Sequence, residues 1–538
     1  MGFPLHRGTV ESGLLTCHWH HARFDLASGG TLDPWADDVP AYAVETSDGR
    51  VTVVVEPDTD RVEHLRLRLD EGLERGITLV VAKAVLGLLG AGVPSEDLVR
   101  AGVEFGVRNR QQGWGAGLTV LVAMANVLPQ LDEGERALAL VHGLSFLSGD
   151  TRGRPPRFPL APLDSRPDLA TVSSWYRRFV DSRSADAAER TLATAIAAGH
   201  GEAAIASMMT AAITDHVFID EGHTLDFTNK AFECLDHLGW TGAARVLPSL
   251  VTQTAAARRH EEESAWRHPD DLAALVREAS DRVGALAARA TDGTGWRDRA
   301  VDHVAGQILG EDPATIVAAL EAAIGAGATA ENLGRAVAYA AALRITRFDT
   351  QNDHGDWNTV HHAFTAANAL HQSLVRSPDP ELLRGVYQVA LRVYLDRFLN
   401  IPAARLPEQS RRARAGLEPI RDLDELQECW DQEGQVDRAG QIVHGYLVDG
   451  GAPGRVVATL GRALLYEDAE FHWFQIYEAA VRQSHAWPEG SPQQALILAG
   501  AARFLAAHTP TRRELSQVVR IAVRLRRGEP LYEELPDP

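Results

Sequence analysis

The chain has 538 residues, of which 45% are hydrophobic and 23% charged, and its net charge at pH 7 is −20. This acidic balance, with no cluster of Lys and Arg along a helix face, excludes nucleic acid as an expected partner. No apolar run reaches the roughly 18 residues that a membrane span needs, and three cysteines are too few for a disulfide framework. We therefore expect a cytoplasmic, globular protein with more than one domain.

The N-terminal segment holds a Cys-x-x-His pair, Cys17 and His20, followed by an aromatic-Asp turn at Phe24 and Asp25. A glycine-rich hairpin comes next, and then the alternating strand-like pattern of AYAVETSDGRVTVVVE. Residues 1–62 therefore resemble the second half of a Rieske iron–sulfur domain, and we expect a small β unit here.

This resemblance implies that Cys17 and His20 are ligands of a [2Fe–2S] cluster, which needs two Cys and two His. The other pair, a Cys-x-His, is expected immediately upstream of Met1, because MGFPLHRGTVESG resembles the stretch that normally follows it. With one Cys and one His in place, we expect the cluster only where the upstream pair is restored.

After about residue 65 the pattern changes to long Ala, Leu and Val stretches with 3.6-residue spacing, separated by Pro and Gly. The fold class predicted is mainly α, a duplicated all-α bundle or repeat body behind the small N-terminal β remnant. The expected divisions are the partial Rieske-like domain at 1–62, helical halves at 70–260 and 315–515, a helical connector at 261–314, and a C-terminal tail at 516–538.

The duplication is predicted from four segments that recur in the same order. Their spacing grows slowly from 235 to 249 residues, as small insertions in loops would cause. The aligned pairs include Glu96 with Glu331, Asn126 with Asn368, His142 with Tyr387, and His223 with His472. If the halves pack about a pseudo-twofold axis, a site is expected in the bundle interior where facing helices meet.

Several histidines lie within apolar helices, where an uncharged imidazole needs a hydrogen-bond partner or a metal. His223 and His472 hold equivalent positions in the two repeats, and a shared axis would bring them together. In the NTVHHAFTAANALHQ helix the spacing does not decide between His361 and His362. Each histidine has a structural alternative, a hydrogen-bonded place in the core; the candidate ligands are His142, His223, His361, His362, His371 and His472.

Lys230 is a further candidate, because it lies two turns after His223 on the same helix face. A charged lysine is costly to bury. It is expected either to pair with Asp226 or Glu233, or, as a deprotonated or carbamylated side chain, to bind the metal.

A site rich in imidazole and poor in carboxylates suits Zn, Fe, Cu or Ni. The Rieske resemblance implies transfer of single electrons to a second centre, which zinc cannot accept, so mononuclear non-haem iron is the expected metal. The D-x-x-H-x-x-x-x-H motif of Rieske ring-hydroxylating oxygenases is not present, because Thr228 stands where the second His is needed after Asp220 and His223. The segment His362-Ala-Phe-Thr365 resembles instead the H-x-x-[TN] element of questin-oxidase-like helical oxidoreductases.

The expected function is a Rieske-type oxidoreductase with a non-haem iron centre. These resemblances imply oxygenation of an aromatic or polyketide-like small molecule, with electrons from a ferredoxin or reductase. Two alternatives stay open, a helical-repeat scaffold with structural histidines and a metal-dependent hydrolase. The chain contains no G-x-S-x-G elbow, no P-loop and no G-x-G-x-x-G after a strand, so serine hydrolase, NTPase and dehydrogenase functions are not expected.

Overall fold

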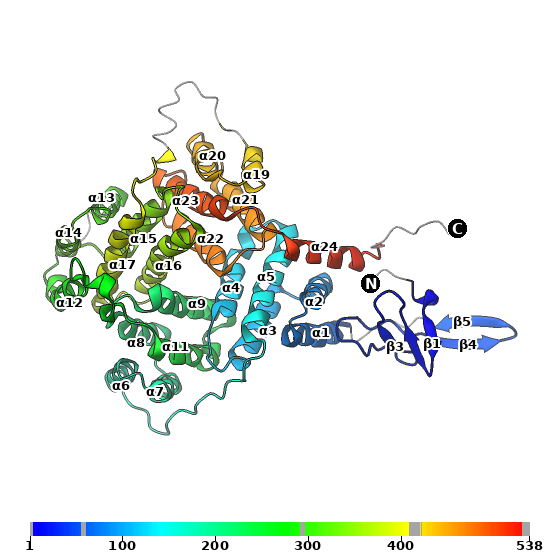
Figure 1. Cartoon of the computed structure of the whole chain (residues 1–538). Coiled ribbons are helices and arrows are strands. Elements are labelled where there is room, and N and C mark those ends of the chain that lie inside the picture. Colours follow the sequence, from blue (N-terminus) through cyan, green and yellow to red (C-terminus); the bar gives the residue numbers. More distant parts are fainter. Residues whose placement is uncertain (1–3, 55–60, 291–295, 408–419, 421, 530–538) are drawn as a thin grey trace.

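The computed structural model of the chain describes residues 4–54, 61–290, 296–407, 420 and 422–529. Within these ranges the protein is mainly helical, with two small sheets near the N-terminus, which confirms the predicted fold class (Figure 1). None of the helices in these ranges is both long and apolar enough to cross a membrane.

The N-terminal unit consists of a three-stranded antiparallel sheet and a separate hairpin. The sheet has strands β1 (Thr9–Glu11), β2 (Leu14–Thr16) and β3 (Arg23–Asp25), and the hairpin has β4 (Ala43–Ser47) and β5 (Arg50–Val54). Its small core contains Cys17, Ala22, Phe24 and Ala36. The unit lies outside the helical body and packs on it through Arg68, which donates to the carbonyls of Pro34 and Ala36.

The helical body begins as the 3.6-residue periodicity predicts, with short breaks at Gly and Pro. Its first helices are α1 (Arg61–Arg75), α2 (Thr78–Gly90), α3 (Ser95–Arg108), α4 (Ala116–Val127) and α5 (Glu133–Thr151). The proline-rich segment 152–168 is a long loop. The loop leads to α6 (Leu169–Asp181), α7 (Ala185–Ala197) and α8 (Glu202–Thr214).

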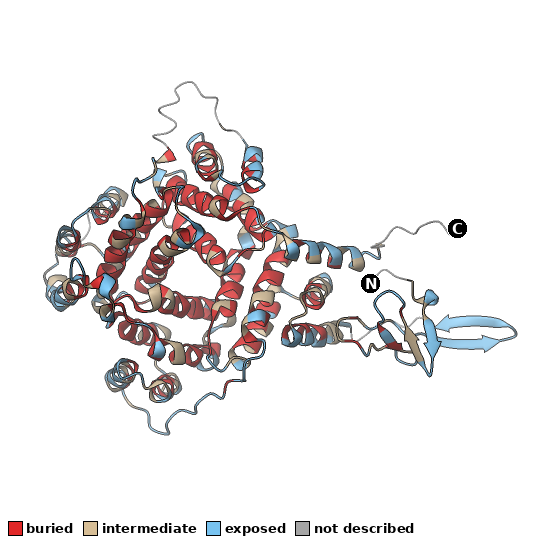
Figure 2. Ribbon diagram, in the orientation of Figure 1, coloured by how far each residue is buried: buried red, intermediate tan, exposed pale blue. Residues whose placement is uncertain are grey.

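An inner ring of helices forms the centre of the body. It consists of α4, α9 (His223–Leu238), α16 (His354–Arg376) and α22 (Phe471–Ser484), and each contacts the next around the ring. Figure 2 shows this centre as mostly buried, with most exposed residues on the outer helices, the loops and the N-terminal unit. The sequence of α4, AGLTVLVAMANV, is apolar on every side, as a helix packed on all faces requires.

The outer layer packs its apolar stripes against this ring. Around it lie α3, α5 and α8, together with α15 (Ala330–Thr346), α17 (Arg384–Leu395) and α23 (Pro492–His508). The remaining helices are α10 (Ala243–Val246), α11 (Val251–Ala256), α12 (Leu272–Arg289), α13 (Asp298–Ile308), α14 (Pro313–Gly325), α19 (Asp424–Trp430), α20 (Val436–Val448), α21 (Pro453–Tyr466) and α24 (Glu514–Arg526).

The inner ring draws α4 and α9 from the first expected half of the chain and α16 and α22 from the second. The segments aligned by sequence fall on α3 and α15, on α4 and α16, on α5 and α17, and on α9 and α22. Superposition of the two halves stays a prediction. The sequence did not predict α24, which lies in the expected tail and packs on α2.

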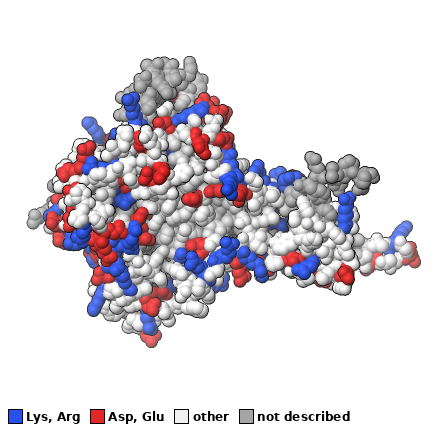
Figure 3. All heavy atoms as spheres, in the orientation of Figure 1, with Lys and Arg blue, Asp and Glu red and all other residues white. Residues whose placement is uncertain are grey.

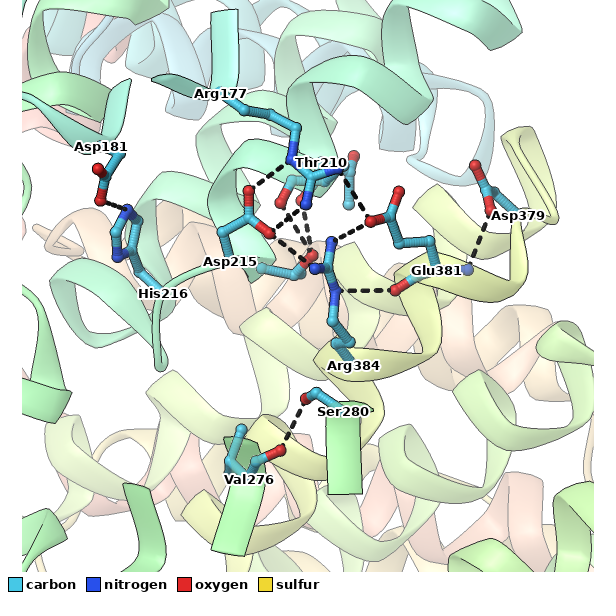
Figure 4. A network of polar contacts seen from close by, with 12 residues as sticks. Arg177, Asp181, Thr210, Asp215, His216, Val276, Ser280, Asp379, Glu381 and Arg384 are labelled. Atoms are coloured by element: carbon cyan, nitrogen blue, oxygen red, sulfur yellow. Dashed lines mark hydrogen bonds and ion pairs between the residues drawn. The ribbon is translucent and has the colours of Figure 1, made fainter. Parts of the chain in front are cut away.

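Ion pairs between elements reinforce the outer layer. Acidic and basic side chains are interspersed on the face shown in Figure 3. Figure 4 shows one network, in which Arg177 of α6 binds Asp215 at 2.6 Å and Glu381 at 2.9 Å. Arg384, the first residue of α17, binds Asp215 at 2.7 Å, so the network joins α6 and α8 to the second half. Because these side chains are partly solvated, each pair contributes at most about 1 kcal/mol.

Candidate metal centre

Three histidines from three inner helices meet at one end of the ring. His223 is the first residue of α9, His362 lies in the first half of α16, and His472 is the second residue of α22. One ring nitrogen from each lies within 4.8 Å of the others, and the Nε2 atoms of His362 and His472 are 3.5 Å apart. Among the residues that the structure describes, this histidine triad is the one group of three or more His, Cys, Asp or Glu with such spacing.

The turn before α9 places His223 in the triad. Phe218, Asp220 and Glu221 have positive φ values of 43°, 50° and 55°, and Gly222 follows at 88°. Such a conformation costs energy in residues other than glycine and persists where the surrounding structure enforces it. At Gly222 a Cβ atom would lie 2.6 Å from that of Ala366 on α16, so the absent side chain allows the turn to approach α16 closely.

The same turn brings a carboxylate to the back of the triad. Glu221 Oε2 lies 3.0 Å from Nδ1 of His362, whose other nitrogen, Nε2, faces His472. Arg258 forms an ion pair with the same Glu221. A carboxylate behind an imidazole fixes the ring orientation and increases the basicity of the nitrogen that binds metal.

Burial favours the uncharged form of the three imidazoles. Burial, followed by repulsion from His362, lowers the pKa of His223 and of His472 to about 3. Burial also lowers the pKa of His362, although Glu221 opposes that shift. The hydrogen bond with His362 in turn holds the pKa of Glu221 well below its usual range. Neutral imidazoles keep their lone pairs, so no proton has to leave before a metal binds.

His361 lies beside the triad but outside the group defined by mutual distance. Its ring centroid is 4.2 Å from those of His362 and His472. Its Nδ1 donates to the carbonyl of Asn358, which leaves the buried Nε2 with a lone pair and without a hydrogen-bond partner. Sequence spacing left the choice between His361 and His362 open, and the geometry places His362 in the triad.

Two other candidate histidines occupy different places. His142 on α5 contacts the Leu465 carbonyl at 2.9 Å through Nε2, and burial lowers its pKa to about 4. His371 contacts Gln483 Oε1 at 3.1 Å and lies about 13 Å along α16 from His362. The structure does not bring either of them to the triad, and both have the hydrogen-bonded core environment that was the structural alternative.

Lys230 is fully buried further along the axis of the inner ring. Its Nζ is 2.8 Å from Glu233 Oε2 and 2.6 Å from Glu478 Oε2, whereas sequence reasoning expected Asp226 or Glu233 alone. Burial would lower the pKa of Lys230, but the nearby carboxylates outweigh it and raise the pKa. The geometry favours an ion-paired lysine over a metal ligand. Sequence reasoning missed Glu221 and Glu478, because both act through contacts distant in sequence.

The candidate cluster ligands differ in exposure. The Cys17 side chain is buried, and its backbone N–H donates to the Ala22 carbonyl at 2.8 Å. His20 is exposed and stacks on Trp19 with ring centroids 4.7 Å apart. The cluster expected from the Rieske resemblance stays a prediction.

Comparison with models of known protein families, with characterised proteins and with solved structures finds no match to this chain.

Proposed function

We propose that this protein is a metal-dependent oxidoreductase whose single iron ion is held by His223, His362 and His472. The observation that carries the proposal is the triad itself, three imidazoles with one ring nitrogen of each within 4.8 Å of the others. Three protein ligands leave coordination positions open for water or substrate, as in catalytic rather than structural sites.

The surroundings of the triad suit an apolar substrate. The rings of Phe227 and Phe471 lie 5.6 Å and 5.7 Å from that of His223. An aromatic or polyketide-like molecule would pack on these rings, and His361 and Glu221 would supply polar contacts. Iron would contribute one-electron chemistry there, and oxygenation is the reaction class that we propose.

The choice of iron rests on the N-terminal segment. Imidazole ligands alone suit zinc, iron, copper and nickel. The resemblance of Cys17 and His20 to Rieske ligands favours a centre that accepts single electrons. A ferredoxin or a reductase is therefore the proposed electron donor.

A second candidate function is metal-dependent hydrolysis. Three histidines with a carboxylate behind one of them also form a ligand set of catalytic zinc sites, where the metal activates water. The contact between Glu221 and His362 is the observation that favours this alternative.

Metal analysis of the protein, purified without chelators, distinguishes these functions. Iron at about one ion per chain, with an electron paramagnetic resonance signal that changes on reduction, is the expected result. Zinc as the sole metal would contradict the redox function and favour hydrolysis. A folded protein that binds neither metal would contradict both and leave a scaffold role.

A further inference from the structure

A column of polar side chains runs along the axis of the inner ring, away from the histidine triad. It starts with Asp226 of α9 and Gln475 of α22, which face each other with Gln475 Nε2 2.6 Å from Asp226 Oδ2. Lys230 follows one turn later, between Glu233 and Glu478. These side chains are at most 3% exposed, so the column is a costly feature in the centre of an apolar bundle.

Asp226 is the acidic residue of this column nearest to the triad along α9, one helical turn after His223. Among the ion pairs of the described residues none includes Asp226, in contrast to Glu233 and Glu478. Burial raises the pKa of Asp226 to about 7, although the charge of Lys230 and the hydrogen bond from Gln475 oppose the shift. A carboxyl in this range is poised to gain or lose a proton near neutral pH.

The groups that act on the Asp226 carboxyl lie on α9 and α22. They are Lys230 and Glu233 on α9, and Gln475 and Glu478 on α22. Asn126 bridges the column, because its Nδ2 donates to Glu233 at 2.7 Å and to Glu478 at 3.1 Å.

The far end of the column reaches a cavity. Glu478 lines a cavity of about 220 Å³ together with Asn126, His237 and Arg482. This cavity lies toward the C-terminal ends of α4, α9 and α22, whereas the triad lies near the N-terminal ends of α9 and α22. The column therefore runs from Asp226 toward this cavity without passing the triad.

We propose that Asp226 is the proton-exchanging group of the metal centre, and that the column formed with Lys230 and Glu478 connects it to solvent. The inference rests on the proposed metal site. A metal cation bound at the triad would favour the deprotonated form of Asp226. The Asp226 carboxyl would then lose one proton to the buffer. When that charge decreases, the carboxylate takes the proton back. The centre would thereby keep its net charge nearly constant.

Calorimetric titration of the metal-free protein with zinc, in buffers of different ionisation enthalpy near pH 7, tests this inference. The wild type should release more protons per zinc than Asp226→Asn, by at most one proton, because the raised pKa leaves part of the Asp226 carboxyls protonated near pH 7. Since the triad is the same in both proteins, its contribution cancels. Glu189→Gln removes a buried carboxylate on α7 and is the matched control, with release equal to the wild type.

Infrared difference spectroscopy supplies a second readout on the unmodified protein. The carbonyl band of a protonated carboxyl should disappear when zinc is added. Zinc binding with equal proton release in the wild type and Asp226→Asn would overturn the inference and leave the metal centre intact. Absence of zinc binding would overturn the metal centre itself, so the two failures are distinguishable.

Discussion

The rings of His223 and His472 lie nearly parallel, with an interplanar angle of 5° and centroids 5.6 Å apart. The same sequence offset of 249 residues joins Asp226 to Gln475, at 2.6 Å, and Glu233 to Arg482, at 3.6 Å. Because the offset is constant, α9 and α22 run in the same direction and face each other across the ring axis. The predicted alignment of the two halves has the same offset in this segment, so the predicted repeat and the site share one geometry.

Replacing Glu221 with Gln should weaken metal binding by about 10- to 100-fold, because the carboxylate that orients His362 is lost. A competition titration with a zinc-binding dye measures the affinity. Glu263→Gln is the matched control, since Glu263 also pairs with Arg258, at 2.8 Å, but does not contact the triad. Equal affinities in the two variants would contradict the proposed role of Glu221.

Lys230→Met should destabilise the protein by up to about 5 kcal/mol, because Glu233 and Glu478 would be left buried with only the more distant, partly exposed Arg482 as a cation, at 3.6 Å and 3.9 Å. Urea unfolding followed by circular dichroism measures this change. The triple variant with Glu233→Gln and Glu478→Gln should recover most of the loss, since the uncompensated charge is removed. A loss below about 1 kcal/mol in the single variant would show that the network is not needed for stability.

Sequence periodicity was sufficient to predict the helical body, and the repeat was sufficient to align His223 with His472. The sequence could not decide between His361 and His362. Adjacent residues point about 100° apart on a helix, and tertiary packing determines which of them faces α9 and α22. Glu221 could not be predicted from the sequence. Its contact with His362 depends on the left-handed backbone conformation of Asp220 and Glu221, which the residue types do not indicate.

Gly222→Ala should destabilise the protein by about 1–3 kcal/mol and weaken metal binding, because the alanine would adopt a positive φ and crowd Ala366. Gly284→Ala on α12 is the control. No atom lies within 4 Å of the added methyl group there, so helix propensity should raise stability by up to about 1 kcal/mol. Unfolding curves of both variants measure these changes in stability. If Gly222→Ala were as stable as the wild type, the close approach of this turn to α16 would be contradicted.

Acid should destabilise the protein partly through His142. Its pKa is about 4 in the folded protein and 6.5 ordinarily, so the unfolded chain binds more protons between these values. The stabilising contribution is therefore complete above pH 6.5 and is lost as the pH falls toward 4, by about 3 kcal/mol at most. His142→Gln should show a smaller loss of unfolding free energy between about pH 7 and pH 5 than the wild type. Identical pH profiles would contradict a buried neutral imidazole.

The most direct test of the metal centre is metal stoichiometry in a double variant. Metal-free wild type, incubated with a small molar excess of Fe²⁺ and then dialysed against metal-free buffer, both without oxygen, should retain about one ion per chain. The variant with His223→Ala and His472→Ala should retain none, whereas His371→Gln, on α16 outside the triad, should bind as the wild type does. Full retention of iron by a folded double variant would contradict the assignment of the triad as the metal site.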